Sequence, residues 1–346
     1  MTNKGFYIYG IVPNFYSPDM FRLLEHSQVF AVGYQNISAI VSETPQTHLN
    51  YLDRESLGRL LVKHQKTIED IQGKGFSMFI PMKLGTIVQS KDEVIKILSK
   101  GYELIIDTLK KIELVSEIDV VATLSNFLAT LQEVSAQPII ADLKHELLKN
   151  ADTLSQMDQI KMGMLVQEKL KEKNEAAKKR LLESLSTISI DQRTHEVMND
   201  EMILNAAFLI QKNNQPKFEE IIDQMDAEYS GELNFKLIGP LPCYSFYTIE
   251  LKEINPFDVK EAKKMLALGD NTSVAEIKKS WHGKAKLLHP DANPENKDDT
   301  EFNNTKKSYH TLLEYAAAVR QATKEDMIWL TPEKVKENLM LVKIKE

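Results

Sequence analysis

The stretch Ser273–Pro294, with the sequence SVAEIKKSWHGKAKLLHPDANP, decides how the C-terminal part of this chain folds. Ser273 and Glu276 have the spacing of a capping box, in which a serine oxygen and a glutamate carboxylate each accept a bond from a backbone N–H at a helix start. The helix ends before Pro290, because proline disfavours helical geometry at the preceding residue. The apolar residues on one face of this helix are Ile277, Trp281, Ala285 and Leu288. The stretch therefore predicts an amphipathic helix that ends at an exposed turn.

Two further predicted helices flank this one. Phe257–Leu268 reads as a helix that ends near Gly269, and Asp270-Asn271-Thr272 forms the turn that follows. After a polar loop, another helix faces the central one through apolar residues, namely Phe302, Tyr309, Leu312 and Leu313. We therefore expect an all-helical module over residues 255–325, with an antiparallel pair of helices joined at a tip that carries His289-Pro290-Asp291.

This module resembles the DnaJ-type J-domain over roughly residues 257–322. The similarity rests on the tripeptide at the tip and on the register of the helices around it. Its further shared residues are Leu268-Gly269, Trp281, Asn293-Pro294, and Phe302 with Tyr309. The resemblance implies that the module binds a DnaK-type chaperone.

The residues expected to contact that chaperone lie at the tip and on the preceding helix. Pro290 fixes the tip and leaves its two neighbours exposed, so that Asp291 can pair with an arginine and His289 can donate or accept a hydrogen bond. Lysines on the helix can steer an acidic partner surface toward the tip. These lysines are Lys278, Lys279, Lys284 and Lys286.

Three residues depart from the J-domain pattern. Gly283 lies within the helix and costs about 1 kcal/mol relative to alanine. Lys284 stands where the family buries a leucine, and Thr305 stands where it buries an isoleucine. Two interpretations stay open: a module that stimulates the partner's ATPase, or a J-like fold that only ends a helix at this tripeptide and presents its lysines as an ordinary solvated face.

The whole chain has 346 residues and a net charge of −7, which allows two or three domains and makes it mildly acidic. An acidic balance argues against a nucleic-acid partner, which needs a basic face. The single cysteine, Cys243, cannot form a disulfide within the chain and reads as a small buried apolar residue. No stretch has the length of a signal peptide or a membrane span, so we expect no membrane contact and a cytoplasmic location.

The residues ahead of the helical module predict two α+β domains. The first, residues 1–125, alternates strands and helices and closes with a strand at Val115–Leu124. The second, residues 126–254, has long helices, two strands, a helix and a strand region interrupted by Gly239-Pro240-Leu241-Pro242, where two prolines demand a bulge or an edge position. The predicted fold class is α+β: two small ferredoxin-like domains joined by long helices, followed by the J-domain-like hairpin and a tail over residues 326–346.

Four phrases in this front part resemble the GvpF/GvpL family of gas vesicle proteins, and they occur in the family's order. They are Phe6–Val12 (FYIYGIV), Ile80–Thr86 (IPMKLGT), Leu204–Leu209 (LNAAFL) and Gly239–Phe246 (GPLPCYSF). Where the family has arginine and phenylalanine, this chain has Lys83 and Leu84, so no binding residue is carried over to it. Each phrase alone is explained by a strand and a turn, but four in order indicate the family.

The resemblance implies a minor component needed to build the gas-filled protein shell. Its expected partners are the gas vesicle shell protein and other gas vesicle accessory proteins, and its expected place is on the gas vesicle. Because a shell subunit with an apolar gas-facing surface aggregates in water, a protein that holds it and recruits a DnaK-type chaperone could deliver it for assembly. The alternative is a general J-domain adaptor that serves an unrelated client, with the front domains as its binding platform.

A third class, an enzyme, would need a cleft in which several titratable groups converge. The sequence supplies no such constellation. The histidines of the front part, His48, His64, His145 and His195, are scattered and form no i,i+4 pair for a metal. We therefore expect no catalysis, no cofactor and no metal site.

Overall fold

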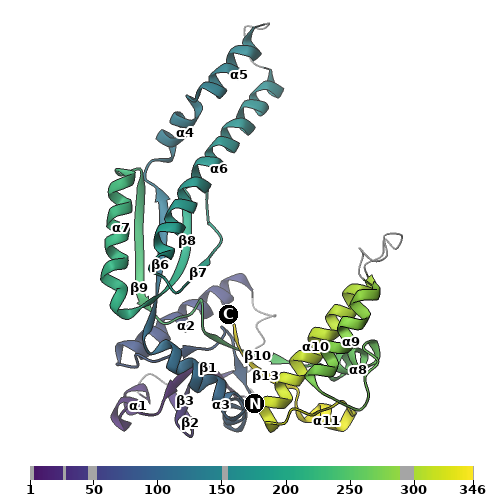
Figure 1. Ribbon diagram of the computed structural model, residues 1–346. Coiled ribbons are helices and arrows are strands. Elements are labelled where there is room, and N and C mark those ends of the chain that lie inside the picture. Colours follow the sequence, from purple (N-terminus) through teal and green to yellow (C-terminus); the bar gives the residue numbers. More distant parts are fainter. Residues whose placement is uncertain (1–3, 26–28, 46–52, 150–154, 289–299, 346) are drawn as a thin grey trace. The chain divides into compact units, whose positions relative to one another are not determined.

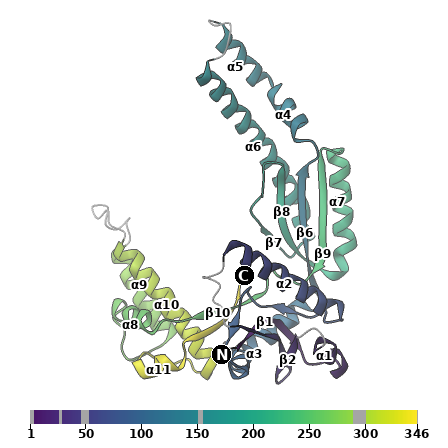
Figure 2. The ribbon, with the colours of Figure 1, turned by 180° about the vertical axis from the view of Figure 1, so that it is seen from behind.

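The computed structural model describes residues 4–25, 29–45, 53–149, 155–288 and 300–345, and Figures 1 and 2 draw it from opposite sides. The chain divides into two compact units, the first formed by Met1–Lys110 with Tyr247–Glu346 and the second by Lys111–Phe246. Sequence had suggested boundaries at 125/126 and 254/255. The chain leaves the first unit and later returns to it, so the N-terminal sheet and the C-terminal helices belong to one unit.

The first unit contains an antiparallel sheet in the strand order β2-β3-β1-β4, with β5 also paired to β1. One helix connects β1 to β2, a second connects β3 to β4, and a third follows β5. This order gives the β-α-β-β-α-β path of a ferredoxin-like domain. The strands are β1 (Lys4–Pro13), β2 (Phe30–Tyr34), β3 (Ile37–Pro45), β4 (Ile80–Pro81) and β5 (Ile87–Val88). The helices are α1 (Pro18–Glu25), α2 (Arg54–Gly73) and α3 (Lys91–Ile112).

A buried polar chain fastens α2 to β1 in this unit. The N–H of Gly85 donates to the Tyr7 hydroxyl over 3.0 Å, and that hydroxyl forms a hydrogen bond with His64 Nδ1 over 2.8 Å. His64 also stacks on Tyr9, with ring centroids 5.8 Å apart. Burial lowers the pKa of His64 to about 4, so the ring is neutral near pH 7. His64 therefore has a structural role between α2 and β1.

The second unit contains an antiparallel sheet in the order β7-β8-β6-β9. Taken along the chain, its strands occupy the same relative positions as those of the first sheet, so both are ferredoxin-like as predicted. The strands are β6 (Val115–Leu124), β7 (Asp191–Thr194), β8 (Met202–Gln211) and β9 (Leu233–Leu241). The helical elements are α4 (Phe127–Ser135), α5 (Pro138–Leu148), α6 (Gln156–Ser186), the short 3₁₀ turn Lys212–Asn214 and α7 (Gln215–Tyr229).

One difference from the sequence-based prediction concerns this sheet. Val115–Leu124 was expected to close the first domain, but as β6 it lies between β8 and β9 at the centre of the second sheet. The pattern of β6 marks it as a strand but does not say with which other strands it pairs, so the sequence could not assign it to a sheet. The Gly239–Pro242 segment was predicted to form a bulge or to lie at a sheet edge. Strand β9 is an edge strand, and its register with β6 shifts between Ile238 and Leu241.

The helices of the second unit have two roles. Helix α7 and the C-terminal part of α6 pack on the sheet, where Leu181, Leu185, Phe208 and Phe218 are buried in one core. Helices α4 and α5 run back along the N-terminal part of α6 and form with it an arm beyond the sheet (Figure 1). A small cluster of Val134, Ile140 and Leu170 holds this arm together.

The C-terminal part of the first unit is a helical module bordered by strands. Its helices are α8 (Pro256–Met265), α9 (Val274–Leu288), α10 (Thr300–Thr323) and α11 (Pro332–Glu337), and its strands are β10 (Thr248–Glu253), β11 (Asn271–Thr272), β12 (Ile328–Trp329) and β13 (Met340–Lys345). The predicted tail is thus three ordered elements. Its apolar residues are buried in the same core as those of α8 and α10, which explains why the tail folds; they are Ile328, Leu330, Val335 and Leu341. No helix in the described ranges is long and apolar enough to cross a bilayer.

Candidate functional site

The helix pair α9 and α10 forms the candidate site, and its start is built as the sequence predicts. Ser273 N–H donates to a Glu276 carboxylate oxygen over 2.8 Å, and Glu276 N–H donates to Ser273 Oγ over 3.3 Å. The Thr272 hydroxyl also donates to this carboxylate. The capping box is therefore present, and it sets where α9 begins.

An aromatic contact aligns the two helices near their shared tip. The Trp281 ring stacks on Tyr309 at 5.2 Å between centroids and 13° between planes, and it lies 5.7 Å from the Phe302 ring. Farther along, Ile277, Leu312 and Tyr315 are fully buried. Thr305 is also buried, and its hydroxyl donates to the Glu301 carbonyl over 2.8 Å. A threonine in place of the family's isoleucine is thus tolerated, because its own helix satisfies the hydroxyl.

The predicted lysines separate into two groups. Lys278, Lys279 and Lys286 are exposed and lie on one face of α9, which we call the α9 basic face. Lys284 lies on the opposite, half-buried side, and its ammonium donates to the carbonyl of Met265 at the end of α8. Ser280 supports the same helix end by donating to the Leu266 carbonyl over 2.5 Å. Lys284 therefore caps α8, where its charge complements the helix dipole, and it is not part of the α9 basic face.

The tip itself, His289-Pro290-Asp291, lies outside the described residues, as does His48. Leu288 ends α9 directly before the tip, and Thr300 begins α10 after it. The roles assigned to these three tip residues therefore stay predictions.

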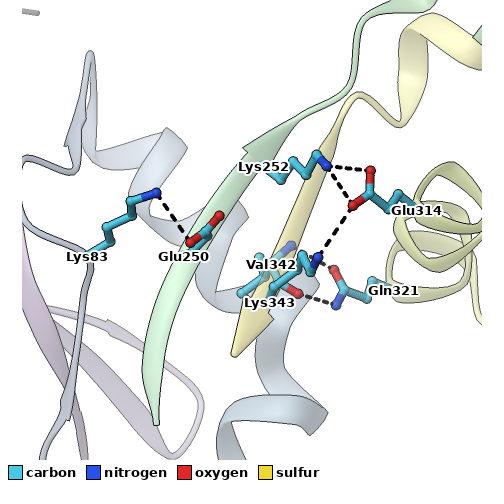
Figure 3. A network of polar contacts seen from close by, with 7 residues as sticks. All are labelled: Lys83, Glu250, Lys252, Glu314, Gln321, Val342 and Lys343. Atoms are coloured by element: carbon cyan, nitrogen blue, oxygen red, sulfur yellow. Dashed lines mark hydrogen bonds and ion pairs between the residues drawn. The ribbon is translucent and has the colours of Figure 1, made fainter. Parts of the chain in front are cut away.

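A polar network that sequence reasoning missed fixes helix α10 to the β10–β13 ladder within the module (Figure 3). Glu314 of α10 binds Lys252 of β10 over 2.6 Å and Lys343 of β13 over 3.4 Å. The Gln321 amide donates to the Val342 carbonyl over 2.6 Å and accepts from its N–H over 3.0 Å. These contacts clamp the β10–β13 ladder against α10. A signal was available, because the alternation in MLVKIK at 340–345 is typical of a strand.

The same ladder continues to the N-terminal sheet. Lys83 N–H donates to the Ile249 carbonyl over 2.8 Å, and the Lys83 ammonium lies 3.3 Å from the Glu250 carboxylate (Figure 3). Helix α3 lies against β13 at Gly101, where a Cβ atom would approach Val342 to 2.8 Å. The module is therefore held by backbone bonds, side-chain pairs and packing.

A cluster of titratable groups lies in the second unit, away from the helix pair. Glu117 of β6 is 1% exposed and accepts 2.9 Å bonds from both the N–H and the hydroxyl of Ser245. Burial is the main cause that raises the pKa of Glu117 to about 8; the nearby charge of Asp119 acts in the same direction, and the Ser245 bonds oppose the shift. His195 Nε2 lies 3.5 Å from the Ser245 hydroxyl. Because Glu117 is occupied by the chain's own segment, the cluster anchors that segment.

Cys243 lies in the same anchored segment. It is 3% exposed, and burial raises the pKa of its thiol to about 12, so it remains a neutral thiol as predicted. Within the described ranges, no three histidine, cysteine or acidic side chains converge in a way that could hold a metal ion.

Comparison with protein families gives two matches on this chain. The family described as "Gas vesicle synthesis protein GvpL/GvpF" matches residues 5–248, and the family described as "DnaJ domain" matches residues 264–317. The first covers both ferredoxin-like sheets. The second covers α9 and most of α10, and it ends before β12, α11 and β13.

Individual relatives match about 70% of this chain. "Gas vesicle protein F" of Nostoc sp. (strain PCC 7120) is 25% identical over 264 residues, which cover 71% of this chain and 99% of that protein. The protein of the same description from Dolichospermum flosaquae is 24% identical, over 70% of this chain and 98% of its own length.

Two crystal structures share the fold of the front part. The gas vesicle protein GvpF from Anabaena sp. PCC7120 aligns with a TM-score of 0.56 and 22% identity, over 70% of this chain and 97% of that one. GvpF from Microcystis aeruginosa aligns with a TM-score of 0.52 and 20% identity, over 70% and 98%.

Proposed function

The chain belongs to the gas vesicle synthesis protein GvpL/GvpF family and carries a DnaJ domain after its family region, and from this premise we propose that it is a gas vesicle assembly factor that recruits a DnaK-type chaperone. In this proposal the front domains hold the apolar shell subunit and contact other gas vesicle accessory proteins. The helical module recruits the chaperone, whose ATP-driven cycle then acts on the subunit. The protein acts in the cytoplasm, on or beside the growing vesicle.

The attachment of the helical module carries this proposal. The module is part of the first unit. Glu314 and Gln321 clamp the β10–β13 ladder against α10, and Lys83 binds that ladder to the N-terminal part through its backbone bond to Ile249 and its ion pair with Glu250. A module on a flexible linker would sample many orientations. A docked module instead keeps a chaperone bound to the α9 basic face at a fixed position relative to the N-terminal sheet. This arrangement suits delivery of a client held by the same protein.

An exposed apolar stripe on the arm of the second unit is our candidate surface for the shell subunit. Met157, Ile160 and Met164 follow one another at helical spacing on α6 and are 63%, 52% and 65% exposed. Methionine side chains adapt to differently shaped apolar partners. Such a stripe can cover part of an apolar subunit surface that would otherwise cause aggregation.

Stimulation of a purified DnaK-type ATPase by the full-length protein tests the chaperone half of the proposal. We expect His289→Gln to abolish the stimulation, and Lys278→Glu with Lys279→Glu to weaken it about tenfold by removing electrostatic steering. Lys306→Glu with Lys307→Glu, the same charge change on exposed residues of α10, is the matched control and should stimulate like the wild type. Absence of stimulation by the wild type would leave the J-like fold as an interaction module only. A fragment ending at residue 322 is unsuitable, because it lacks the core residues Leu330 and Leu341.

Capture of the major shell protein tests the holding half. We expect the full-length protein to retain the shell protein, and glutamine at Met157, Ile160 and Met164 together to lose most of it. The matched control places glutamine at three exposed apolar residues of α2, namely Leu57, Leu61 and Val62. Loss of capture in the α2 variant alone would move the binding surface to α2.

Deletion of the gene separates this proposal from a general J-domain adaptor. Cells that lack an assembly factor should lose buoyant vesicles. Intact vesicles in the deletion strain would favour the adaptor for an unrelated client.

A further inference from the structure

A groove between α8 and α11 lies on a part of the module that the proposed function does not use. Its floor is apolar, with Leu330 and Val335 from the C-terminal segment and Leu268 from the turn after α8. Phe257 forms one wall and is 64% exposed. The groove has a volume of about 430 Å³, which is enough for a few bulky side chains. Helix α11 and most of α8, which form the two sides of the groove, lie outside the region that the DnaJ domain family matches.

The rim of the groove is basic. Lys260, Lys263, Lys264 and Lys336 line it, and no acidic side chain does. Lys263 pairs with Asp270, and Lys264 pairs with Glu261. Within the described ranges, Lys260 and Lys336 form no ion pair. The chain as a whole carries a net charge of −7, so this rim is a local reversal of charge.

The positive charge continues past one end of the groove. Pro256 and Lys336 also line a neighbouring hollow of about 720 Å³, together with Lys96 and Lys100 of α3. Burial lowers the pKa of Lys100, and the charge of Lys96 lowers it further. The N-terminus of α8 lies between the groove and the hollow and adds the positive end of a helix dipole. Two carboxylates, Glu253 and Glu337, line the hollow, and Glu337 already pairs with Lys334.

We propose that this groove docks an acidic segment of a partner protein whose bulky apolar side chain inserts beside Phe257. Insertion removes apolar surface of both partners from water, which drives binding. Carboxylates that flank the inserted side chain meet the rim lysines, which steer the encounter and fix the orientation of the segment. The groove lies on α8 and α11, so an acidic segment can bind there while a chaperone contacts the α9 basic face.

Binding of labelled peptides to the full-length protein tests this inference. The probe is a short fluorescein-labelled peptide of glutamate and serine with a central Leu-Phe pair, followed by fluorescence polarisation. One comparison peptide replaces Leu-Phe by Ser-Ser, and another replaces each glutamate by lysine. We expect the acidic peptide with Leu-Phe to bind at least about tenfold more tightly than either comparison peptide, and to weaken with added salt.

Two variants assign the binding to the groove. Lys260→Glu with Lys336→Glu should weaken binding of the acidic peptide by about tenfold or more, and Phe257→Ala should weaken it several-fold. Neither variant removes a buried side chain, so the fold should persist and circular dichroism checks this. Lys306→Glu with Lys307→Glu makes the same charge change on α10 and should bind like the wild type.

Three outcomes would overturn the inference. They are an absence of binding to the acidic peptide, equal binding of the lysine peptide, and unchanged binding by the Lys260→Glu, Lys336→Glu variant. None of them depends on ATPase stimulation or on capture of the shell protein, so the groove and the proposed function can fail separately.

Discussion

The first sheet, β2-β3-β1-β4, and the second, β7-β8-β6-β9, follow the same path, yet they bury opposite kinds of ionisable group. Against the first sheet, His64 is buried as a neutral ring, and its pKa falls to about 4. On the central strand of the second sheet, Glu117 is buried as a carboxylic acid, and its pKa rises to about 8. Burial favours the uncharged form in both cases. Two domains of the same topology can therefore respond to pH in opposite ways, because single buried side chains determine the response.

The largest expected effect breaks the packing of the first sheet. At Gly10 a Cβ atom would lie 2.5 Å from the Ile80 carbonyl oxygen and would overlap the Phe79 ring, so Gly10→Ala should destabilise the first unit by about 3 kcal/mol. Urea unfolding followed by tryptophan fluorescence measures this, because both tryptophans, Trp281 and Trp329, lie in that unit.

Gly58→Ala is the matched control for that prediction. Gly58 lies in α2 of the same unit, and a Cβ atom there meets nothing within 4 Å. The control should gain up to about 1 kcal/mol from helix propensity. A Gly10→Ala protein as stable as the control would contradict the close approach of β1 to β4.

The next largest effect concerns the stability of the second unit at high pH. The pKa of Glu117 is higher in the folded protein than the ordinary 4.5, so its contribution to stability is present below about pH 4.5 and is lost as pH rises through about 8. Glu117→Gln keeps an acceptor for Ser245 without the charge, and should stabilise the second unit at pH 9 by about 2 kcal/mol while changing little at pH 5. Circular dichroism during urea unfolding measures both. Equal pH profiles of variant and wild type would argue against a buried acid here.

The opposite pH response is expected of the first unit. The pKa of His64 is lower in the folded protein than the ordinary 6.5, so its contribution to stability is present above about pH 6.5 and is lost as pH falls through about 4. His64→Gln keeps an acceptor for the Tyr7 hydroxyl but cannot gain a proton. Between pH 6.5 and 4.5 the wild type should lose about 1–2 kcal/mol more than the variant, as read by tryptophan fluorescence. An identical acid response would mean that other groups dominate.

The smallest effect tests the anchor on Glu117. Ser245→Ala removes the hydroxyl donor and keeps the N–H donor, so it should cost about 1 kcal/mol. Because the lost bond favours the charged carboxylate, the pKa of Glu117 should rise, and the loss of stability should continue to higher pH. A shift to lower pH would contradict this role of the hydroxyl.

Local patterns in the sequence settled much of the C-terminal helix pair. The Ser273–Glu276 capping box set the start of α9, and the predicted apolar faces of the two helices contain Trp281 and Tyr309, which stack on each other. These features depend on residues close together in the chain, so their spacing predicts them.

Local sequence patterns predicted only part of the candidate site. Four lysines were grouped by their closeness in the sequence, but Lys284 turns toward the end of α8 and leaves three on the α9 basic face. The groove between α8 and α11 was not foreseen at all. The groove forms only when the C-terminal segment folds back onto α8, and no pattern within α8 predicts this contact.

The sequence by itself determined the family, the α+β class, the order of most elements and the residues on which a chaperone contact is proposed. The tertiary structure alone decided that β6 belongs to the second sheet, that residues 326–345 complete the helical module, and that the chain returns to its first unit after Phe246. The physical reason is the range of the forces involved. Capping, helix periodicity and proline geometry act over a few residues, whereas strand pairing and core burial join segments far apart in the chain.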